Sequence, residues 1–356
     1  MPHPFAAFYR GKRVLVTGHT GFQGGWLVAW LKLLGAKVLG YGLPPSSRPN
    51  FFDATLLDRG ISSVFGDVRD RNTLANAFTD FQPEIMIHCA WQSGQQRALR
   101  EPVETFATNL MGAVHVLEEA RLTNSVRGVV LAASQSCYVD RNWFWGYREE
   151  DMLGGDDPHS ASLATAEVAS SAYQRSFFQN RKASVATARL VSAIGGGDWA
   201  EERLVPNIVR EITSGMPFVR DHGNSLRQWQ HVLESARACL LLGQSLYEHR
   251  HAYSGPWNFA PPEEAAISER ELAERFAKTW GAEITLAIQD AAAEELHSFR
   301  LNIRKAQTQL GWSTALDIDE AIYWTVEWYR AFYLDPASAW HTTEEQIEQY
   351  MKRTIT

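Results

Sequence analysis

The sequence contains little cysteine, no run of basic residues and no long uninterrupted hydrophobic segment. The three cysteines, Cys89, Cys137 and Cys239, are widely spaced and form no CxxC pair. This pattern argues against a disulfide framework or a zinc site, so no metal is expected, and it favours a reducing compartment. The 34 Lys and Arg residues against 41 Asp and Glu give a formal charge of −7, so no nucleic-acid partner is expected.

The most apolar early segment, GWLVAWLKLLGAKVLGYGL, is interrupted by Lys32 and Lys37. Its uninterrupted apolar runs are too short to span a membrane. The opening stretch MPHPFAAFYR lacks the charged start and the long apolar core of a signal peptide. A cytoplasmic protein without a membrane partner is therefore expected. Its 356 residues, 45% of them hydrophobic, are enough for two domains that share an interface.

Short β-branched runs alternate with helical stretches along the first half of the chain. Strands are expected at residues 13–18, 37–43, 63–68, 84–90, 128–134 and 184–195, and helices at about 22–34, 71–81, 105–121 and 160–180. This alternation predicts an α/β protein with a Rossmann-type doubly wound parallel sheet that carries helices on both faces.

Beyond about residue 190 the sequence becomes rich in turns and predicts a smaller C-terminal lobe at the carboxyl edge of the sheet, where ligands bind in such folds. Helices are expected there at 267–281, with Ser268 and Glu271 as a capping box, and at 317–334. The dinucleotide-binding Rossmann domain is predicted to comprise residues 1–190 plus about 228–260, and the substrate-binding lobe about 191–227 and 261–356.

The stretch VTGHTGFQGGW follows the first expected strand and opens the first expected helix. Gly18, Gly21 and Gly24 have the spacing GxxGxxG, which allows a tight turn, close approach of a pyrophosphate and close helix–strand packing. The amides at the helix start favour an anionic ligand, so a dinucleotide site is predicted. No acidic residue ends the second strand, and Arg48 beyond it is either a partner for a 2′-phosphate or an exposed loop arginine. NAD is expected as the cofactor, with NADP not excluded.

Matching stretches run along nearly the whole chain: GKRVLVTGHTGF.GGWL, GDVRD, FQPEI..H.A.Q, EPVET..TN.MG, WGYRE, IGGGDWA..R.VP, R.WQHVLE, WNF.P and QLGW. On these motifs the sequence resembles the extended short-chain dehydrogenases/reductases and, within that group, the CDP-glucose 4,6-dehydratases. The motifs GGGDWA and WQHVLE are not generic to the superfamily. The resemblance implies a tightly bound NAD that is used without net turnover, and a nucleotide-linked sugar as the small-molecule substrate.

The resemblance also implies roles for particular positions. Around the cofactor it places Gly18, Gly21, Phe22, Gln23 and Gly24 at the phosphates, Asp67 and Val68 beside the adenine, Ala90 and Trp91 beside the cofactor, and Asn109 in support of that loop. Facing the nucleotide diphosphate it places Arg203, Arg227, Gln230 and His231. Members of this group commonly pair through two long helices, so a homodimer through about 105–121 and 160–178 is expected.

The chain departs from the family pattern where protons are transferred. The family tract TSDKCY reads ASQSCY here, so Ser134 is retained while Gln135, which cannot give up a proton, replaces the acid. The tyrosine and lysine of the following helix are His159 and Leu163, and a small residue beside the cofactor is Trp91. Because the binding motifs stand while the proton-transfer groups are replaced, the sequence predicts a bound nucleotide without standard 4,6-dehydration.

His159 has two interpretations. An imidazole has a pKa of about 6.5 and works as a base near neutral pH without a lysine, whereas a tyrosine at about 10 needs one. Replacement of both residues therefore makes sense as a single change, although histidine is shorter than tyrosine by roughly 2 Å and a base must come within hydrogen-bond reach of its proton. The alternative is that His159 caps the start of the helix after Pro158.

Three functions stay open on the sequence. The first is an enzyme that acts on a nucleotide-linked sugar by oxidoreduction, epimerisation or another isomerisation, using His159 with Ser134. The second is a non-catalytic nucleotide-binding paralogue, and the third is a redox-neutral lyase or cyclase that reuses the pocket. Trp91 would favour the second and third if it filled the nicotinamide site.

Overall fold

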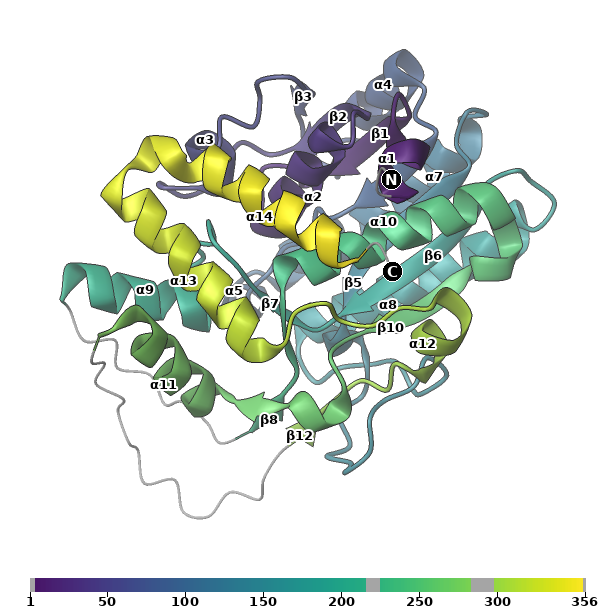
Figure 1. The fold of residues 1–356 in the computed structure, drawn as a ribbon. Coiled ribbons are helices and arrows are strands. Elements are labelled where there is room, and N and C mark those ends of the chain that lie inside the picture. Colours follow the sequence, from purple (N-terminus) through teal and green to yellow (C-terminus); the bar gives the residue numbers. More distant parts are fainter. Residues whose placement is uncertain (1–3, 216–224, 283–297, 355–356) are drawn as a thin grey trace.

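A parallel β-sheet forms the centre of the computed structural model, which describes residues 4–215, 225–282 and 298–354 (Figure 1). Its strands are β1 (Arg13–Thr17), β2 (Lys37–Gly42), β3 (Ser62–Phe65), β4 (Ile85–His88), β5 (Gly128–Ser134), β6 (Ser184–Leu190) and β10 (Gly255–Phe259). The strand order in this 7-stranded sheet is β10-β6-β5-β4-β1-β2-β3. The α/β doubly wound fold is thereby confirmed, although the last strand, β10, was not predicted.

The order of the strands reverses between β1 and β4, which are direct neighbours in the sheet. The chain builds outward from β1 to β3 on one side and from β4 to β10 on the other. In doubly wound sheets the crevice at such a reversal, beyond the carboxyl ends of the strands, is where ligands bind. The loops after β1 and β4 are therefore the place to examine for a site.

Helices cover both faces of the sheet (Figure 1). On one face α2 (Phe22–Leu33) and α10 (Val232–His249) pack together, and α14 (Ala339–Arg353) lies over α2. The other face carries α4 (Arg71–Phe81), α7 (Gly112–Leu122) and α8 (Pro158–Tyr173). Two separate clusters of buried apolar side chains fill these two layers, so the sheet is buried on both sides, as a parallel sheet requires.

Two helices that the sequence predicts as continuous are interrupted by π-helical turns. The expected helix at 105–121 divides into α6 (Pro102–Phe106), the π segment η1 (Ala107–Met111) and α7. The expected helix at 160–180 divides into α8 and the π segment η3 (Gln174–Phe178). Such turns often mark functional positions, and η1 contains Asn109.

The single strand expected at 184–195 is also wrong, because the chain leaves the main sheet at Val191. The strand β6 ends at Leu190, and β7 (Ser192–Ile194) then pairs with β9 (Trp229–His231) in a separate two-stranded sheet. A pattern of apolar residues cannot reveal a change of pairing partner, since apolar side chains continue from β6 through Val191 into β7.

The second part of the chain gathers beyond one end of the main sheet (Figure 1). It comprises α9 (Leu204–Ser214), α11 (Glu269–Trp280) and α13 (Ile318–Leu334), with a three-stranded sheet of β8 (Leu226–Arg227), β11 (Ile267–Ser268) and β12 (Ser298–Phe299). Ser268 caps α11 by accepting from the backbone of Glu271 at 3.1 Å, and Asp317 and Glu320 form a full capping box on α13. The smaller elements are α1 (Pro4–Tyr9), α3 (Phe51–Ala54), α5 (Gln95–Arg100), η2 (Gln135–Cys137), η4 (Arg250–Tyr253), η5 (Glu263–Ala265), α12 (Arg304–Leu310) and η6 (Pro336–Ser338).

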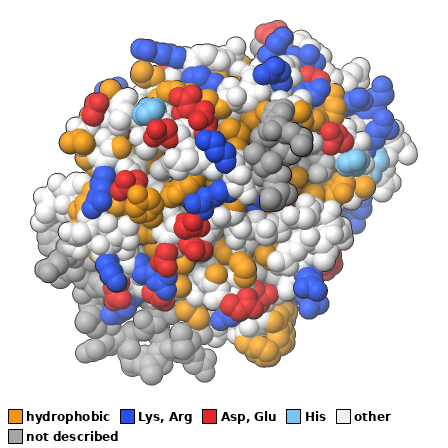
Figure 2. Space-filling model, in the orientation of Figure 1, with side chains coloured by type: hydrophobic (Ala, Val, Ile, Leu, Met, Phe, Trp, Pro, Cys, Tyr) orange, Lys and Arg blue, Asp and Glu red, His pale blue; other side chains and the backbone are white. Residues whose placement is uncertain are grey.

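The division into two domains at the predicted boundaries stays a prediction, and residues 216–224 and 283–297 of the second domain lie outside the described residues. None of the helices in the described ranges is long and apolar enough to cross a membrane. On the face shown in Figure 2, basic and acidic side chains are interspersed.

Candidate functional site

The glycine turn between β1 and α2 has a geometry that only glycine allows at two of its three positions. Gly18 has a φ of 71°, and a Cβ there would lie 2.6 Å from the carbonyl oxygen of Cys89. A Cβ on Gly24 would lie 2.2 Å from the carbonyl oxygen of Gly18. Among the described residues, a Cβ on Gly21 would meet only that same oxygen, at 3.4 Å, which is ordinary contact. The inner side of the turn is therefore closed by backbone and the side at Gly21 is open, as a cradle for a pyrophosphate requires.

The loop after β3, which holds Asp67 and Val68, is fixed by its neighbours. The Tyr41 hydroxyl donates to the backbone carbonyl of Asp67 at 2.9 Å, and a ring nitrogen of His115 lies 2.9 Å from the carbonyl oxygen of Val68. The Asp67 carboxylate accepts from Arg69 at 3.0 Å, and this hydrogen bond holds the pKa of Asp67 below its usual value. The structure thus places these two residues at the carboxyl edge, and their contact with adenine stays a prediction.

The loop after β4 lies directly against the glycine turn, as the contact between Gly18 and Cys89 shows. Below it, a ring nitrogen of His88 lies 2.7 Å from the Thr17 hydroxyl, and burial lowers the pKa of His88 to about 3, so the ring is neutral. The Trp91 ring packs on His88 with centroids 4.6 Å apart, and its indole nitrogen is buried without a partner among the described residues. The pairing of Thr17 with His88 carries no sequence signal of its own.

Asn109 connects this loop to the first turn of α8. Its side-chain oxygen accepts from the backbone nitrogen of Gln92 at 2.7 Å, and its amide nitrogen donates to the carbonyl oxygen of Gln92 at 3.3 Å. The same nitrogen donates to the Ser162 hydroxyl at 2.8 Å, which donates in turn to the carbonyl oxygen of His159 at 2.7 Å. Asn109 therefore holds the loop and the His159 turn in one arrangement. The sequence predicted no role for Ser162 or for Gln92, although Gln92 ends the matched motif FQPEI..H.A.Q.

His159 lies in the first turn of α8 but does not cap it, so that interpretation is wrong. Asp157 is the N-cap, and its carboxylate accepts from the backbone nitrogens of His159 at 2.8 Å and Ser160 at 3.2 Å. The Nδ1 atom of His159 is buried and has no partner among the described residues. Burial lowers the pKa of the imidazole below its ordinary value, although the charge of Asp157 and the backbone of Gln92 act in the opposite direction. The ring is therefore neutral at pH 7, as a base must be.

Ser134 and Gln135 lie at the end of β5, against which α8 packs. The Ser134 hydroxyl oxygen accepts from the backbone nitrogen of Ser136 at 3.2 Å and thereby caps the short helix η2. Gln135 is buried, and its side-chain oxygen has no partner in the described part of the chain. Leu163, at the position where the family has a lysine, is 2% exposed and belongs to the apolar core.

Arg203 and Arg227, predicted to face a nucleotide diphosphate, occupy different surroundings. Arg203 forms a 2.9 Å ion pair with Asp198, and its guanidinium lies over the Phe22 ring at 5.8 Å. It therefore joins the start of α2, just after the glycine turn, to the GGGDW loop. Arg227 lies on β8, and its guanidinium lies 3.9 Å from the carboxylate of Glu269.

Gln230 and His231 are buried and have structural partners. Gln230 donates to the Ser235 hydroxyl at 2.9 Å. His231 caps α10 by accepting from the backbone of Leu233 at 3.3 Å, and its ring packs edge-on against tryptophans on both sides, Trp26 and Trp324. A direct contact of Arg203, Arg227, Gln230 or His231 with a ligand stays a prediction. The described residues include no group of three or more metal-ligating side chains.

Residues 14–254 match the NAD dependent epimerase/dehydratase family. The chain belongs to this family. The family predicted from the motifs is thereby confirmed, and so is NAD as the cofactor. Binding of its phosphates at the turn of Gly18, Gly21 and Gly24 stays a prediction.

The chain is 36% identical to the CDP-glucose 4,6-dehydratase of Salmonella typhimurium over 98% of both chains. Among solved structures, a UDP-glucose 4-epimerase from Stenotrophomonas maltophila superposes with a TM-score of 0.79 at 20% identity, covering 91% of this chain and 99% of that one. The Thermus thermophilus UDP-glucose 4-epimerase in complex with NAD superposes with a TM-score of 0.76 at 23% identity, covering 89% and 99%. These two likenesses show the fold.

Proposed function

We propose that this chain is a NAD-binding enzyme that changes a nucleotide-linked sugar by oxidoreduction, epimerisation or another isomerisation, and not by standard 4,6-dehydration. The observation that supports this most directly is the connection through Asn109, which holds the loop beside the glycine turn and the turn of His159 together. The same hydrogen bonds therefore fix the position of the proposed base relative to the proposed cofactor site.

The chain's own residues divide the work as follows. The backbone around Gly18 and Gly21 holds the phosphates of NAD, which supplies a hydride acceptor when bound. The neutral imidazole of His159 takes the proton of a sugar hydroxyl, and the Ser134 hydroxyl orients that group. Elimination of water needs an acid that can give up a proton, and the amide of Gln135 has none to give.

The test begins with the purified protein. Denaturation should release NAD, identified by its mass, and incubation with CDP-glucose should yield no 4-keto-6-deoxy sugar. Efficient formation of that product would overturn the proposal, and so would a protein that neither carries NAD nor binds it when it is added. The nucleotide CDP is chosen because the Salmonella relative carries it in its name.

A non-catalytic nucleotide-binding paralogue is the second candidate, and Leu163 favours it. The lysine position is filled by an apolar side chain that is 2% exposed, so the contact that the family's lysine makes with the nicotinamide ribose is lost. This candidate expects stoichiometric binding of NAD and of a sugar nucleotide with no product after long incubation. Any product that depends on His159 excludes it.

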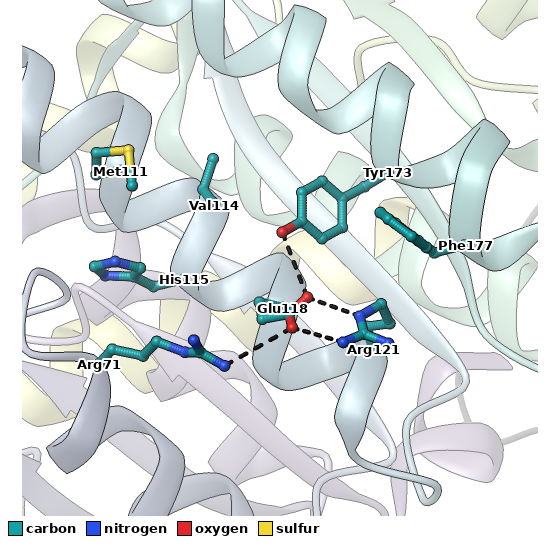
Figure 3. Close-up of a pocket in the computed structure, with 8 residues that line it drawn as sticks. All are labelled: Arg71, Met111, Val114, His115, Glu118, Arg121, Tyr173 and Phe177. Carbon is teal, nitrogen blue, oxygen red and sulfur yellow. Dashed lines mark hydrogen bonds and ion pairs between the residues drawn. The ribbon is translucent and has the colours of Figure 1, made fainter.

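We also propose a homodimer through the face formed by α7, α8 and their π segments. A groove of about 480 Å³ lies between them and the start of α4, and it is lined by Arg71, Met111, Val114, His115, Glu118, Arg121, Tyr173 and Phe177 (Figure 3). At its centre Glu118 accepts from Arg121 at 2.7 Å and from the Tyr173 hydroxyl at 3.4 Å. Met111 and Phe177 at its sides are 43% and 46% exposed, which supports burial of this face against a second copy.

A further inference from the structure

Gln92, in the loop between β4 and α5, has a buried side-chain oxygen without a partner among the described residues. Only 6% of the residue is exposed. Its amide nitrogen donates to the Thr105 hydroxyl at 2.9 Å, and that hydroxyl donates its one hydrogen to the carbonyl oxygen of Glu101 at 2.9 Å. Since the Thr105 hydroxyl can only accept from Gln92, the amide nitrogen must face Thr105 and the oxygen is left free.

The free oxygen belongs to a fixed loop beside the candidate base. Both backbone groups of Gln92 are hydrogen-bonded to Asn109, which is also tied to the His159 turn through Ser162. Burial lowers the pKa of the His159 imidazole, and the backbone of Gln92 acts against that shift. A buried carbonyl without a donor is unfavourable, and a ligand that brings a donor removes that cost.

A second free acceptor lies at the end of the neighbouring strand. His88 of β4 and Leu131 of β5 are paired in the sheet. Gln92 and Gln135 follow the carboxyl ends of these two neighbouring strands, so both lie at the same edge of the sheet. The side-chain oxygen of Gln135 is likewise buried and without a partner in the described ranges. A carboxylate or phosphate has only lone pairs to offer two such oxygens, whereas a hydroxyl group offers a hydrogen.

We propose that Gln92 is a specificity-determining residue, whose side-chain oxygen accepts a hydrogen bond from a ring hydroxyl of the sugar, with Gln135 as a second acceptor. This inference rests on the proposed function, because it requires the sugar to reach the carboxyl edge of β4 and β5. It narrows the substrate class to a sugar with a free ring hydroxyl at the position that faces Gln92. A sugar without the hydroxyl that Gln92 binds leaves a buried oxygen unpaired and is rejected.

The first experiment measures the equilibrium binding of CDP and of CDP-glucose to the NAD-saturated protein. In Gln92→Leu the preference for CDP-glucose over CDP should fall about tenfold while the affinity for CDP itself stays the same. Gln346→Leu is the matched control, because Gln346 is also 6% exposed, donates its amide nitrogen at 2.8 Å to the Trp324 carbonyl and leaves its oxygen unpartnered. It lies on α14, and its substitution should leave the preference unchanged.

The second experiment identifies the hydroxyl with CDP-glucose derivatives in which fluorine replaces one ring hydroxyl at a time, since fluorine cannot donate. For the wild type, one derivative should bind about tenfold more weakly than CDP-glucose. For Gln92→Leu, the same derivative and CDP-glucose should bind with equal affinity, because the hydrogen bond is already lost. Additive losses for every derivative, or an unchanged preference in Gln92→Leu, overturn this inference alone. Failure of the wild type to bind either CDP or CDP-glucose overturns the proposed function and this inference with it.

Discussion

At the scale of single residues, His159 and Leu163, which replace the family's tyrosine and lysine, are chemically compatible with each other. A tyrosine needs a nearby cation to lose its proton near neutral pH, and an imidazole does not. The structure adds that burial lowers the pKa of the His159 imidazole, so this group needs no lysine to be deprotonated near neutral pH. Leu163 packs in the core instead.

The pH dependence of turnover follows from this pKa. A base works in its deprotonated form, and burial lowers the pKa of His159 below the ordinary value of about 6.5. Turnover should therefore stay level from neutral to mildly alkaline pH and decline only as the pH falls below about 6.5. Initial rates across this range check the prediction, and a rate that rises steeply above neutral pH contradicts it, since that is the behaviour of a group with a high pKa.

Removal of the imidazole should have a large effect on turnover and a small one on binding. His159→Ala is expected to lower kcat by about 10²–10⁴-fold, the usual contribution of a general base, and to leave NAD bound. Thr165→Ala is the control on the same helix, because Thr165 is exposed and its hydroxyl donates to backbone carbonyls of its own helix. Unchanged turnover in His159→Ala would remove the histidine from the mechanism.

At the scale of elements, substitutions at two glycines of the glycine turn should affect NAD binding and protein stability separately. Gly21→Ala places a Cβ in ordinary contact at 3.4 Å, so the protein should fold with an unchanged midpoint of thermal unfolding. The added methyl occupies the side from which a pyrophosphate approaches, so NAD affinity should fall at least about tenfold. Gly24→Ala is the contrasting variant, because its Cβ would lie 2.2 Å from a carbonyl oxygen and must destabilise the fold. Equal NAD affinity in Gly21→Ala and wild type would exclude this turn as the phosphate site.

The helix α8 is fixed to the sheet by a buried ion pair between Glu167 and Arg189. The two side chains, 4% and 2% exposed, meet at 3.0 Å, and Arg189 also donates to the Tyr138 hydroxyl at 2.6 Å. Glu167→Ala leaves a buried guanidinium without its counter-charge and should lower the free energy of unfolding by about 3–5 kcal/mol, measured in urea. Glu101→Ala breaks an exposed pair with Arg97 and should change it by about 0–1 kcal/mol. Similar losses in both variants contradict this account.

The sequence predicts elements well where one physical signal decides them. The helix at 71–81 and the strand at 128–134 have the bounds expected, since caps and β-branched runs are local features. The break at Val191 was missed because pairing partners are chosen far along the chain. For the site, the motifs locate the glycine turn and His159, whereas the acceptor role of Gln92 depends on Thr105 and Asn109 through contacts that no spacing predicts.

At the scale of the whole molecule, the proposed dimer explains why apolar side chains remain exposed on α8 and on the π segment η3 that follows it. Val168 is 58% exposed and Phe177 is 46% exposed, and both lie within the stretch about 160–178 that the family resemblance assigns to pairing. A stable interface buries at least about 1,000 Å², so a charge near its centre is costly. Phe177→Glu should therefore yield monomers in analytical ultracentrifugation.

Phe144→Glu is the matched control for this prediction, because Phe144 is 81% exposed and lies in the loop between β5 and α8, outside the proposed interface. It should leave the dimer intact. The dimer also bears on the site, since α8 carries both the exposed face and His159 at its first turn. Because pairing is expected to stabilise α8, Phe177→Glu should lower kcat as well as the molecular mass of the particle in solution. A higher protein concentration should restore the dimer and the kcat together. A monomeric wild type, or a Phe177→Glu variant that remains a dimer, contradicts the pairing through these helices.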